Sequence, residues 1–420
     1  MSFFTVRGDT LCAENVPVRD IANRVGTPCY IYSKQALENA WLGFDSAFGD
    51  YPHLVCFAVK ANSNIGVLNT LAKLGAGFDI VSGGELQRVI AAGGDPSKVF
   101  FSGVAKSREE IAFALEQQVR SINIESPAEL ERVQSVAVEV GKIANISVRV
   151  NPDVDPQTHP YISTGLEEAK FGVSMQDSLR VFQQAQKYSH TKVFGVAYHI
   201  GSQITSTAPF EDALDRVISL IKTLAEMDIN IEHLDMGGGY GIVYNEEELP
   251  SQREFIQALL NKLDSANIKL PVSIEPGRSI AGNAGILVTE VSYLKENTDK
   301  NFAIIDAAMN DLMRPSLYDA WHTITPITTP NNETVERVYD VVGPVCETGD
   351  ILGKNRRLAI EHGDLLAIHS TGAYGFTMSS NYNTRPRAAE VLVNDKQWQI
   401  IRDREATTDL FALESVPSWA

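Results

Sequence analysis

The chain has 420 residues, of which 44% are hydrophobic and 21% charged, values typical of folded rather than disordered proteins. Its 36 Lys and Arg against 53 Asp and Glu give a net charge of -17, so we expect neither nucleic acid nor an anionic membrane as a partner. Arg7 and Asp9 precede any long apolar run, which predicts no signal peptide or membrane span and favours a cytoplasmic location. Four widely spaced cysteines without a C-x-x-C pair favour reduced thiols and no metal site.

The first 30 residues contain two strand-like runs, FFTV and CYIY. Between about residues 51 and 278, short β-branched or aromatic runs then alternate with longer amphipathic stretches, as in parallel strands joined by crossover helices. Helices are expected at residues 107–118, where SREE forms a capping box, and at residues 127–140. The strand-like runs begin near Leu54, Gly77, Val99, Ser121, Ile146, Val193, Ile231 and Val272. Eight strand–helix units predict an α/β fold, a (β/α)8 barrel.

After Arg278 the pattern changes to strand-like runs separated by Gly, Pro, Asn and Asp turns. These runs are NFAIIDAAM, RVYDVVGPV, DLLAIHST, AAEVLVN and QWQIIR. We therefore expect a barrel domain over residues 31–280. A second, mostly β domain, a sandwich or barrel, is expected over residues 281–420 and includes residues 1–30.

Unusually polar residues close the predicted barrel strands. In such a barrel the active site lies at the C-terminal ends of the strands, so these side chains should meet at one mouth. They are Lys60, Asp79, Arg149, Asn151, His199, Gly237 to Gly239, Glu275 and Arg278. Each alone is a weak signal, since a lone lysine here is usually a solvated cap and three glycines are usually a turn. Their convergence is what indicates a site.

The chemistry of this set fits pyridoxal phosphate. Three glycines let backbone N–H groups approach a phosphate, and Arg278 adds a positive charge. Lys60 can form a Schiff base once desolvation lowers its pKa. Glu275 placed against the pyridine nitrogen would keep that nitrogen protonated, and His199 could stack on the ring. The simpler interpretation of Glu275, a salt bridge with Arg278, is less favoured at a barrel mouth.

These motifs resemble the fold type III pyridoxal-phosphate-dependent decarboxylases, whose fold is alanine-racemase-like, over nearly the whole chain. The matching segments are FAVKAN around Lys60, HIGSQ, GGG and EPGR, in that order. The resemblance implies that Lys60 carries the cofactor. It also implies that cofactor contacts are made by Asp79, His199, Ser202, Gly237, Gly238, Gly239, Glu275, Gly277 and Arg278. Phe57 and Thr348 depart from the family's usual tyrosine and serine, at positions without an assigned role.

The second domain carries three further segments similar to this family. In Cys346-Glu347-Thr-Gly-Asp, the resemblance implies that the cysteine protonates the substrate carbon across the interface of a homodimer with shared active sites. A buried, inert thiol is the alternative. In MRPSLY, Arg314 and Tyr318 are implied to bind substrate, and Tyr374 in GAYGF to contact both cofactor and substrate.

Charge indicates which substrate fits. Ornithine and lysine end in an ammonium alone. Meso-diaminopimelate, a substrate that the resemblance also implies, ends in an amino-acid group, so it needs a fixed cation as well as an acid at its distal end. Arg278 and Arg314 can supply the cation, Tyr318 a hydroxyl and Glu347 the anion. We therefore expect decarboxylation of meso-2,6-diaminopimelate to L-lysine, the last step of lysine biosynthesis.

Other functions remain open at this point. A decarboxylase for ornithine, arginine or carboxynorspermidine has the same fold but would gain nothing from Arg314. A non-catalytic pyridoxal-phosphate carrier would not need the second domain, and an alanine racemase should have arginine at position 275. The long segment of residues 151–172 could act as a lid.

Overall fold

The computed structural model describes residues 3–155, 170–298, 300–331 and 333–419. The chain divides into two compact units. The barrel unit comprises Glu38–Val243 and Glu247–Ile280, and the β-rich unit comprises Met1–Leu37, Tyr244–Glu246 and Ala281–Ala420. Most of the segment suggested as a lid, residues 156–169, lies outside the described residues.

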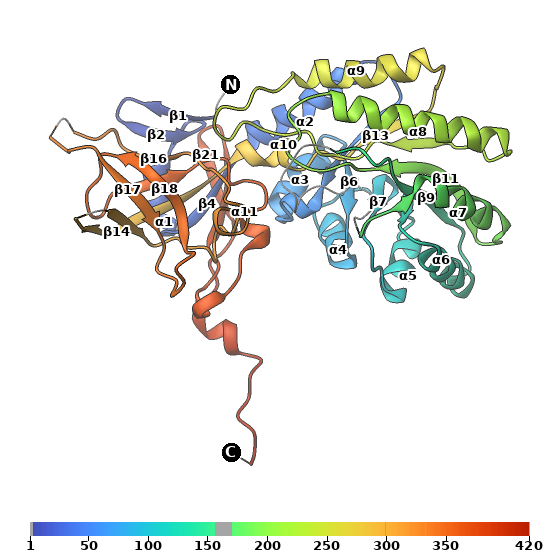
Figure 1. Cartoon of the computed structure of the whole chain (residues 1–420). Coiled ribbons are helices and arrows are strands. Elements are labelled where there is room, and N and C mark those ends of the chain that lie inside the picture. Colours follow the sequence, from blue (N-terminus) through green and yellow to red (C-terminus); the bar gives the residue numbers. More distant parts are fainter. Residues whose placement is uncertain (1–2, 156–169, 299, 332, 420) are drawn as a thin grey trace. The chain divides into compact units, whose positions relative to one another are not determined.

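Eight parallel strands close into a ring in the barrel unit. Several of these strands and the helices around them are labelled in Figure 1. They follow the order β9-β11-β12-β13-β5-β6-β7-β8, and β8 pairs with β9 to complete the ring. Their bounds are β5 (His53–Ala58), β6 (Gly77–Ile80), β7 (Val99–Phe101), β8 (Ser121–Ile124), β9 (Ala144–Asn151), β11 (Thr191–Tyr198), β12 (His233–Asp235) and β13 (Val272–Ile274). The predicted (β/α)8 barrel is confirmed, and each strand overlaps a predicted run. The short strand β10 (Val173–Ser174) pairs in parallel with the end of β9 and is not part of the ring.

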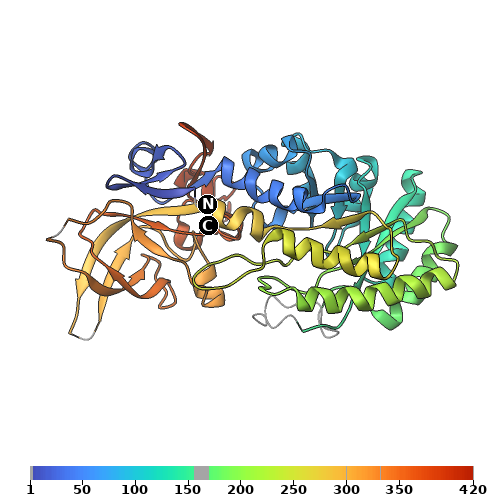
Figure 2. The same ribbon diagram turned by 90° about the horizontal axis from the view of Figure 1, so that it is seen from above.

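Helices lie on both sides of these strands in Figure 2. They are α2 (Lys34–Phe48), α3 (Ile65–Lys73), α4 (Gly83–Ala91), α5 (Arg108–Glu116), α6 (Pro127–Val140), α7 (Met175–Lys187), α8 (Ala208–Glu226), α9 (Gln252–Ser265) and α10 (Arg278–Ala281). The predicted capping box is confirmed at α5, where the Ser107 hydroxyl accepts from the Glu110 amide and the Glu110 carboxylate accepts from the Ser107 amide. Pro127 begins α6, where no helical N–H is needed.

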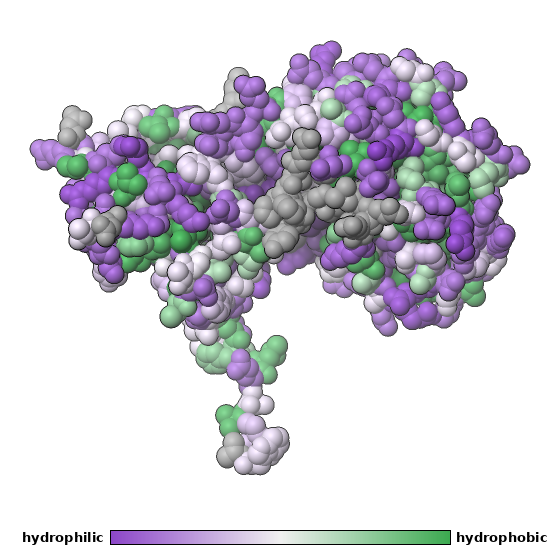
Figure 3. Space-filling model, in the orientation of Figure 1, coloured by the Kyte–Doolittle hydropathy of each residue, from purple (hydrophilic) through white to green (hydrophobic). Residues whose placement is uncertain are grey.

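The barrel strands are covered on both faces, so their side chains are buried without alternation. Phe57, Phe78, Phe100 and Phe101 are all fully buried. The face of this unit seen in Figure 3 is largely hydrophilic, because its helices present their polar sides to solvent. No helix among the described residues combines the length and the apolar character that crossing a bilayer requires.

The β-rich unit contains a sheet of order β18-β17-β15-β14-β4-β20-β21, in which β19 also pairs with β14 and β16. A separate sheet joins β1, β2 and β3. The bounds are β1 (Phe4–Arg7), β2 (Thr10–Ala13), β3 (Val16–Pro17), β4 (Cys29–Ser33), β14 (Gly285–Glu296), β15 (Asn301–Ile305), β16 (Ile324–Pro326), β17 (Arg337–Val342), β18 (Ile351–Leu358), β19 (Leu365–Ile368), β20 (Ala389–Asn394) and β21 (Gln397–Arg402). The helices of this unit are α1 (Val18–Val25) and α11 (Arg314–Tyr318).

Two long strands, β14 and β18, are absent from the predicted runs. The charged sequence KNRR interrupts the apolar pattern of β18, and polar residues become frequent in the second half of β14. Both strands are nevertheless held by neighbours on two sides, β14 by β4 and β15, and β18 by β17 and the nearby α11. Strands β14 and β18 therefore form because of their tertiary pairing, since the local sequence preference for strands is weak.

Candidate active site

Lys60 lies directly beyond the first barrel strand and faces the second. Strand β5 ends at Ala58, and Lys60 lies in the following single turn of 3-10 helix. Its Nζ atom is 3.1 Å from Oδ2 of Asp79, a fully buried residue of β6 that is paired with Ala58 in the sheet. The Lys60 side chain is 37% exposed, so it is held by the Asp79 carboxylate and is still partly accessible.

The three glycines form a tight turn packed against the loop that follows β11. A Cβ atom on Gly237, whose φ is +64°, would lie 2.2 Å from the carbonyl oxygen of Tyr198. On Gly239, whose φ is +115°, it would lie 2.4 Å from the carbonyl oxygen of Gly201. The Ile204 amide donates to the Gly239 carbonyl at 2.9 Å. Only glycine fits these positions, and the two loops form one cradle lined by backbone.

A cation and a hydroxyl belong to the same cradle. Arg278 is the first residue of α10 and is buried, and its Nη2 atom donates to the Ser202 hydroxyl at 3.0 Å. Gly277 precedes it, and a Cβ atom there would lie only 3.0 Å from the methyl groups of both Ala58 and Ala61. The arginine therefore follows a segment that lies directly against the Lys60 turn. Backbone amides, a hydroxyl and a guanidinium together suit a phosphate.

His199 connects the two loops and is neutral. Its Nδ1 atom accepts a hydrogen bond from the Gly238 amide at 3.2 Å, so the imidazole proton lies on Nε2. The pKa of His199 lies well below its usual range, because burial penalises the cation and Lys60 and Arg149 lie nearby. A neutral imidazole held by the backbone can serve as a flat surface for a ring.

Glu275 is tied to the glycine turn, because its amide donates to the Gly237 carbonyl at 2.8 Å. Burial, together with the charges of Asp235 and Asp79, raises the pKa of Glu275 well above its usual value. Burial also raises the pKa of Asp235 to about 6, and Asp235 pairs in the sheet with Ser273, which stands two positions before Glu275. Sequence reasoning missed Asp235, although it is the last residue of β12 and stands two positions before Gly237.

Arg149 forms an ion pair with Glu125 at 3.3 Å, and its guanidinium lies 4.9 Å from the ring centre of Phe171. Glu125 also accepts from the Gly172 amide at 2.9 Å, and Asn151 donates to the Phe171 carbonyl. Arg149 and Asn151 therefore anchor the described end of the segment that returns to β10. Glu125 was not identified from sequence, because nothing in SINIE distinguishes it from a solvated glutamate.

The other predicted site residues lie in the β-rich unit. Arg314 begins α11 and is buried, with its guanidinium 4.5 Å from the ring centre of Tyr244. Its Nη1 atom is 2.8 Å from Nε2 of His322, whose Nδ1 atom donates to the His369 carbonyl. Because the carbonyl accepts from Nδ1, Nε2 is the acceptor for the Arg314 N–H group. Arg314 is thus a fixed cation, while Tyr318, at the other end of α11, is half-buried.

Cys346 and Glu347 are exposed in a loop, whereas the other three cysteines are buried. The loop is held by the buried carboxylate of Asp350, which accepts from the amides of Val345 and Met309 at 2.8 and 2.6 Å. The Cys346 amide donates to Asn383 at 3.0 Å. The exposure contradicts the alternative of a buried, inert thiol.

Tyr374 is half-buried and has a φ of +56°. This left-handed conformation is uncommon for a bulky residue, and such strain concentrates at functional sites. This strained backbone supports the predicted role of Tyr374 in contacting cofactor and substrate.

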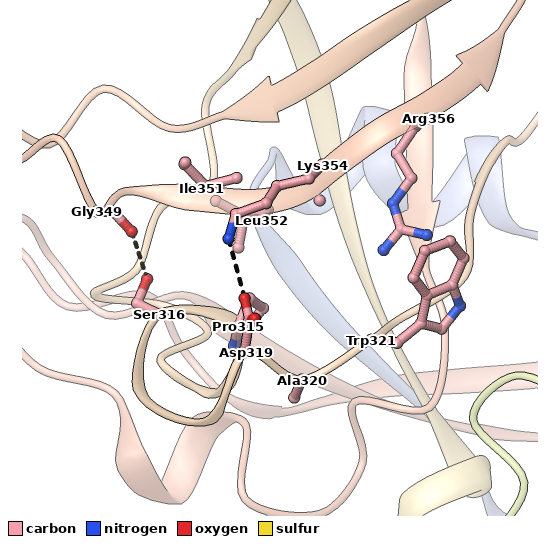
Figure 4. A pocket seen from close by; sticks show the side chains of 11 residues that line it. Pro315, Ser316, Asp319, Ala320, Trp321, Gly349, Ile351, Leu352, Lys354 and Arg356 are labelled. Carbon is pink, nitrogen blue, oxygen red and sulfur yellow. Dashed lines mark hydrogen bonds and ion pairs between the residues drawn. The ribbon is translucent and has the colours of Figure 1, made fainter.

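A cavity of about 330 Å³ lies beside α11 and β18 in the β-rich unit (Figure 4). At one side the Ser316 hydroxyl donates to the Gly349 carbonyl at 2.7 Å, which joins α11 to the loop of Cys346. At the other side the guanidinium of Arg356 lies against the ring of Trp321. The cavity therefore borders both substrate-binding segments predicted for this unit.

Comparisons with known proteins show the family to which this chain is similar. Residues 34–282 match the family model described as the pyridoxal binding domain of pyridoxal-dependent decarboxylases. The diaminopimelate decarboxylase of Vibrio cholerae is 55% identical, over 99% of both chains. Two solved structures of diaminopimelate decarboxylases in complex with L-lysine are also similar. The one from Helicobacter pylori is 42% identical over 94% of this chain and 98% of its own, with a TM-score of 0.90. The one from M. jannaschii is 35% identical over 99% and 98%, with a TM-score of 0.94.

Proposed function

We infer that this chain, which belongs to the diaminopimelate decarboxylase family of pyridoxal-dependent decarboxylases, converts meso-2,6-diaminopimelate to L-lysine and CO2. The observation that carries this conclusion is the barrel mouth. A lysine paired with a buried carboxylate, a neutral histidine, a buried glutamic acid and a glycine cradle all lie there. The reaction is the last step of lysine biosynthesis.

The described residues fit pyridoxal phosphate as the cofactor. Gly237 and Gly239 let the backbones of the two loops pack closely into one cradle, and Ser202 with Arg278 adds donors for a phosphate. Oε1 of Glu275 is buried and receives no N–H or O–H donor among the described residues, so it can meet a protonated ring nitrogen. When bound, the cofactor supplies a carbonyl that condenses with amines and a ring that accepts an electron pair.

In the barrel unit we propose distinct roles for the surrounding side chains. Lys60 Nζ holds the cofactor covalently, and Asp79 keeps that amine in place. His199 supports the face of the ring, and Glu275 holds the proton at the ring nitrogen. Ser202, Arg278 and the turn of Gly237, Gly238 and Gly239 bind the phosphate, and Gly277 lets the segment before Arg278 lie against the Lys60 turn.

In the β-rich unit, we propose that Arg314 and Tyr318 bind the distal carboxylate of the substrate and that Glu347 binds its distal ammonium. Arg278 supplies a second cation, and Tyr374 contacts both substrate and cofactor. The geometry that supports this is the anchoring of Arg314 by His322 and Tyr244, because a preorganised guanidinium loses little freedom on binding.

Cys346 is proposed to deliver a proton from Sγ to the substrate carbon that has lost CO2, and to do so across a homodimer with shared sites. Its support is an exposed thiol in a loop braced by Asp350 and Asn383. General acids of this kind accelerate reactions by roughly 10²- to 10⁴-fold.

The test is CO2 release by the purified protein with pyridoxal phosphate, offered meso-diaminopimelate, lysine, ornithine or arginine separately. We expect release from diaminopimelate alone and formation of L-lysine. Release from ornithine or arginine without release from diaminopimelate would overturn the substrate assignment and leave a decarboxylase of the same fold.

A further inference from the structure

A buried carboxyl with no role in the proposed mechanism lies under the glycine turn. We propose that Asp235 is a positioning residue for the cofactor, which holds the Gly237 turn with one oxygen and shares a single proton with Glu275 through the other. The inference rests on the proposed function, because it concerns how the barrel prepares Glu275 for the ring nitrogen.

The first half of the proposal is a chain of hydrogen bonds. Oδ1 of Asp235 accepts from the Gly237 amide at 3.0 Å, and the Gly237 carbonyl accepts from the Glu275 amide at 2.8 Å. The Gly237 turn is already packed tightly against the end of β11, since a Cβ atom on Gly237 would overlap the Tyr198 carbonyl oxygen. The turn therefore cannot move closer to β11. One side chain therefore sets both the cradle and the start of the EPGR segment.

The second half concerns the two carboxyls. Asp235 is 1% exposed and Glu275 is 9% exposed. They belong to neighbouring parts of the barrel, because Asp235 pairs with Ser273, which stands two positions before Glu275. Oδ2 of Asp235 and Oε1 of Glu275 are both buried and receive no N–H or O–H donor among the described residues. Two carboxyl oxygens can face each other in a hydrogen bond only when one of them carries a proton.

The surroundings favour keeping that proton. The other titratable groups near the pair are Asp79, Cys56 and Tyr198, which add no positive charge, and Lys60, whose ammonium already lies on Asp79. Burial raises the pKa values of both Asp235 and Glu275. Among the described residues no group of three or more His, Cys, Asp or Glu is arranged to hold a metal ion, so a metal does not explain the cluster.

A ring that carries a positive nitrogen would replace the shared proton as the partner of Glu275. The pair then gives up one proton, either to the ring nitrogen or to solvent, and both carboxyls become anionic beside the cation. The Asp235–Glu275 pair thus releases one proton when the ring binds, whereas a buried acid with a purely structural role would release none.

Two substitutions separate the two halves. Asp235→Asn keeps an oxygen for the Gly237 amide and places an NH2 group against Glu275, so Glu275 becomes anionic without a shared proton. Asp235→Ala removes both contacts. Asp311→Asn is a matched control, since Asp311 is a buried aspartate of the β-rich unit that accepts the Ala308 amide and whose pKa burial raises to about 6.

The experiment is calorimetry of pyridoxine 5′-phosphate binding to cofactor-free protein, in buffers of different ionisation enthalpy. This probe has the ring nitrogen and phosphate but no aldehyde, so Lys60 does not contribute a condensation step. We expect the wild type to release about one proton more per ligand than Asp235→Asn, whatever the charge of the free ligand. Affinity should change by less than about threefold in Asp235→Asn and fall by roughly tenfold or more in Asp235→Ala.

Equal proton release by the wild type and Asp235→Asn would overturn the shared proton, and unchanged affinity of Asp235→Ala would overturn the positioning of the turn. A changed proton count in Asp311→Asn would also overturn the assignment, since any buried aspartate would then have the same effect. If the wild type binds no pyridoxine 5′-phosphate, the proposed cofactor itself is wrong, which is a distinct result.

Discussion

The two units hold their functional side chains in different ways. In the barrel unit Lys60, His199, Glu275 and Arg278 lie at strand ends, and each is tied to another element by a hydrogen bond or ion pair. In the β-rich unit Cys346 is exposed in a loop, and Tyr374 has a strained backbone. The barrel unit therefore has the rigidity that holding a cofactor requires, whereas the loops of the β-rich unit carry the groups that we propose to reach the substrate.

This difference predicts two kinds of mutational effect. Changes in the barrel unit should alter cofactor binding together with turnover. Changes in the β-rich unit should alter turnover or substrate affinity and leave the cofactor in place. Each experiment below either sharpens that division or breaks it.

The largest effect is expected from Lys60→Ala. Loss of the only amine paired with Asp79 among the described residues should lower turnover by at least about 10³-fold. The phosphate cradle remains, so pyridoxal phosphate should still bind, but without a covalent link. Borohydride reduction followed by mass spectrometry should label the wild type and not the variant. A labelled variant would assign the attachment to another lysine.

Cys346→Ala should lower turnover by roughly 10²- to 10³-fold, because a general acid is lost. The visible absorbance of the bound cofactor should stay unchanged, since the thiol belongs to the β-rich unit. Stopped-flow and steady-state measurements on the same preparation test both statements. Normal turnover would remove Cys346 from the mechanism.

The same two variants test whether active sites are shared between subunits. Mixing inactive Lys60→Ala with inactive Cys346→Ala under conditions of subunit exchange should restore part of the activity. Restoration requires that an intact lysine and an intact cysteine from different chains meet at one site. No restoration, with exchange shown by mass spectrometry, would count against a shared site.

A smaller effect, on KM rather than kcat, is expected for Arg314→Met. Loss of a fixed cation should weaken binding of the distal carboxylate by ~1 to 3 kcal/mol, which is roughly fivefold to 150-fold in KM. Arg356→Met is the control, because Arg356 is also a buried arginine of the β-rich unit stacked on an aromatic ring, that of Trp321. Equal KM increases in both variants would indicate a general loss of structure.

The smallest effect concerns stability and Glu85, at the start of α4. Burial raises the pKa of Glu85 from 4.5 to about 7, so the folded state holds its proton more firmly than the unfolded state does. This group therefore makes the free energy of unfolding fall as pH rises from about 4.5 to about 7. Urea unfolding of Glu85→Gln should show a flatter profile across that range. An unchanged profile would exclude Glu85 as the source.

Much of the barrel site follows from the sequence alone. The strand–helix alternation predicted all eight barrel strands, and polar residues at their ends led to Lys60, His199 and Glu275, because parallel strands in a barrel must end at one mouth. Local signals were strong where one residue type alone fits. Gly237 and Gly239 are such positions, since backbone oxygens occupy the space of a Cβ atom.

The sequence did not identify Asp235, Glu125 or the strands β14 and β18. An aspartate at a strand end can be a solvated cap or a buried acid, and only its neighbours decide which. Asp235 became significant because β12 and β13 place it beside Glu275, about forty positions away in the chain. The local sequence thus predicted which residue types lie at the strand ends and in what order. Burial, proton sharing and the packing of Arg314 against Tyr244 were decided by contacts between distant segments, which only the folded chain creates.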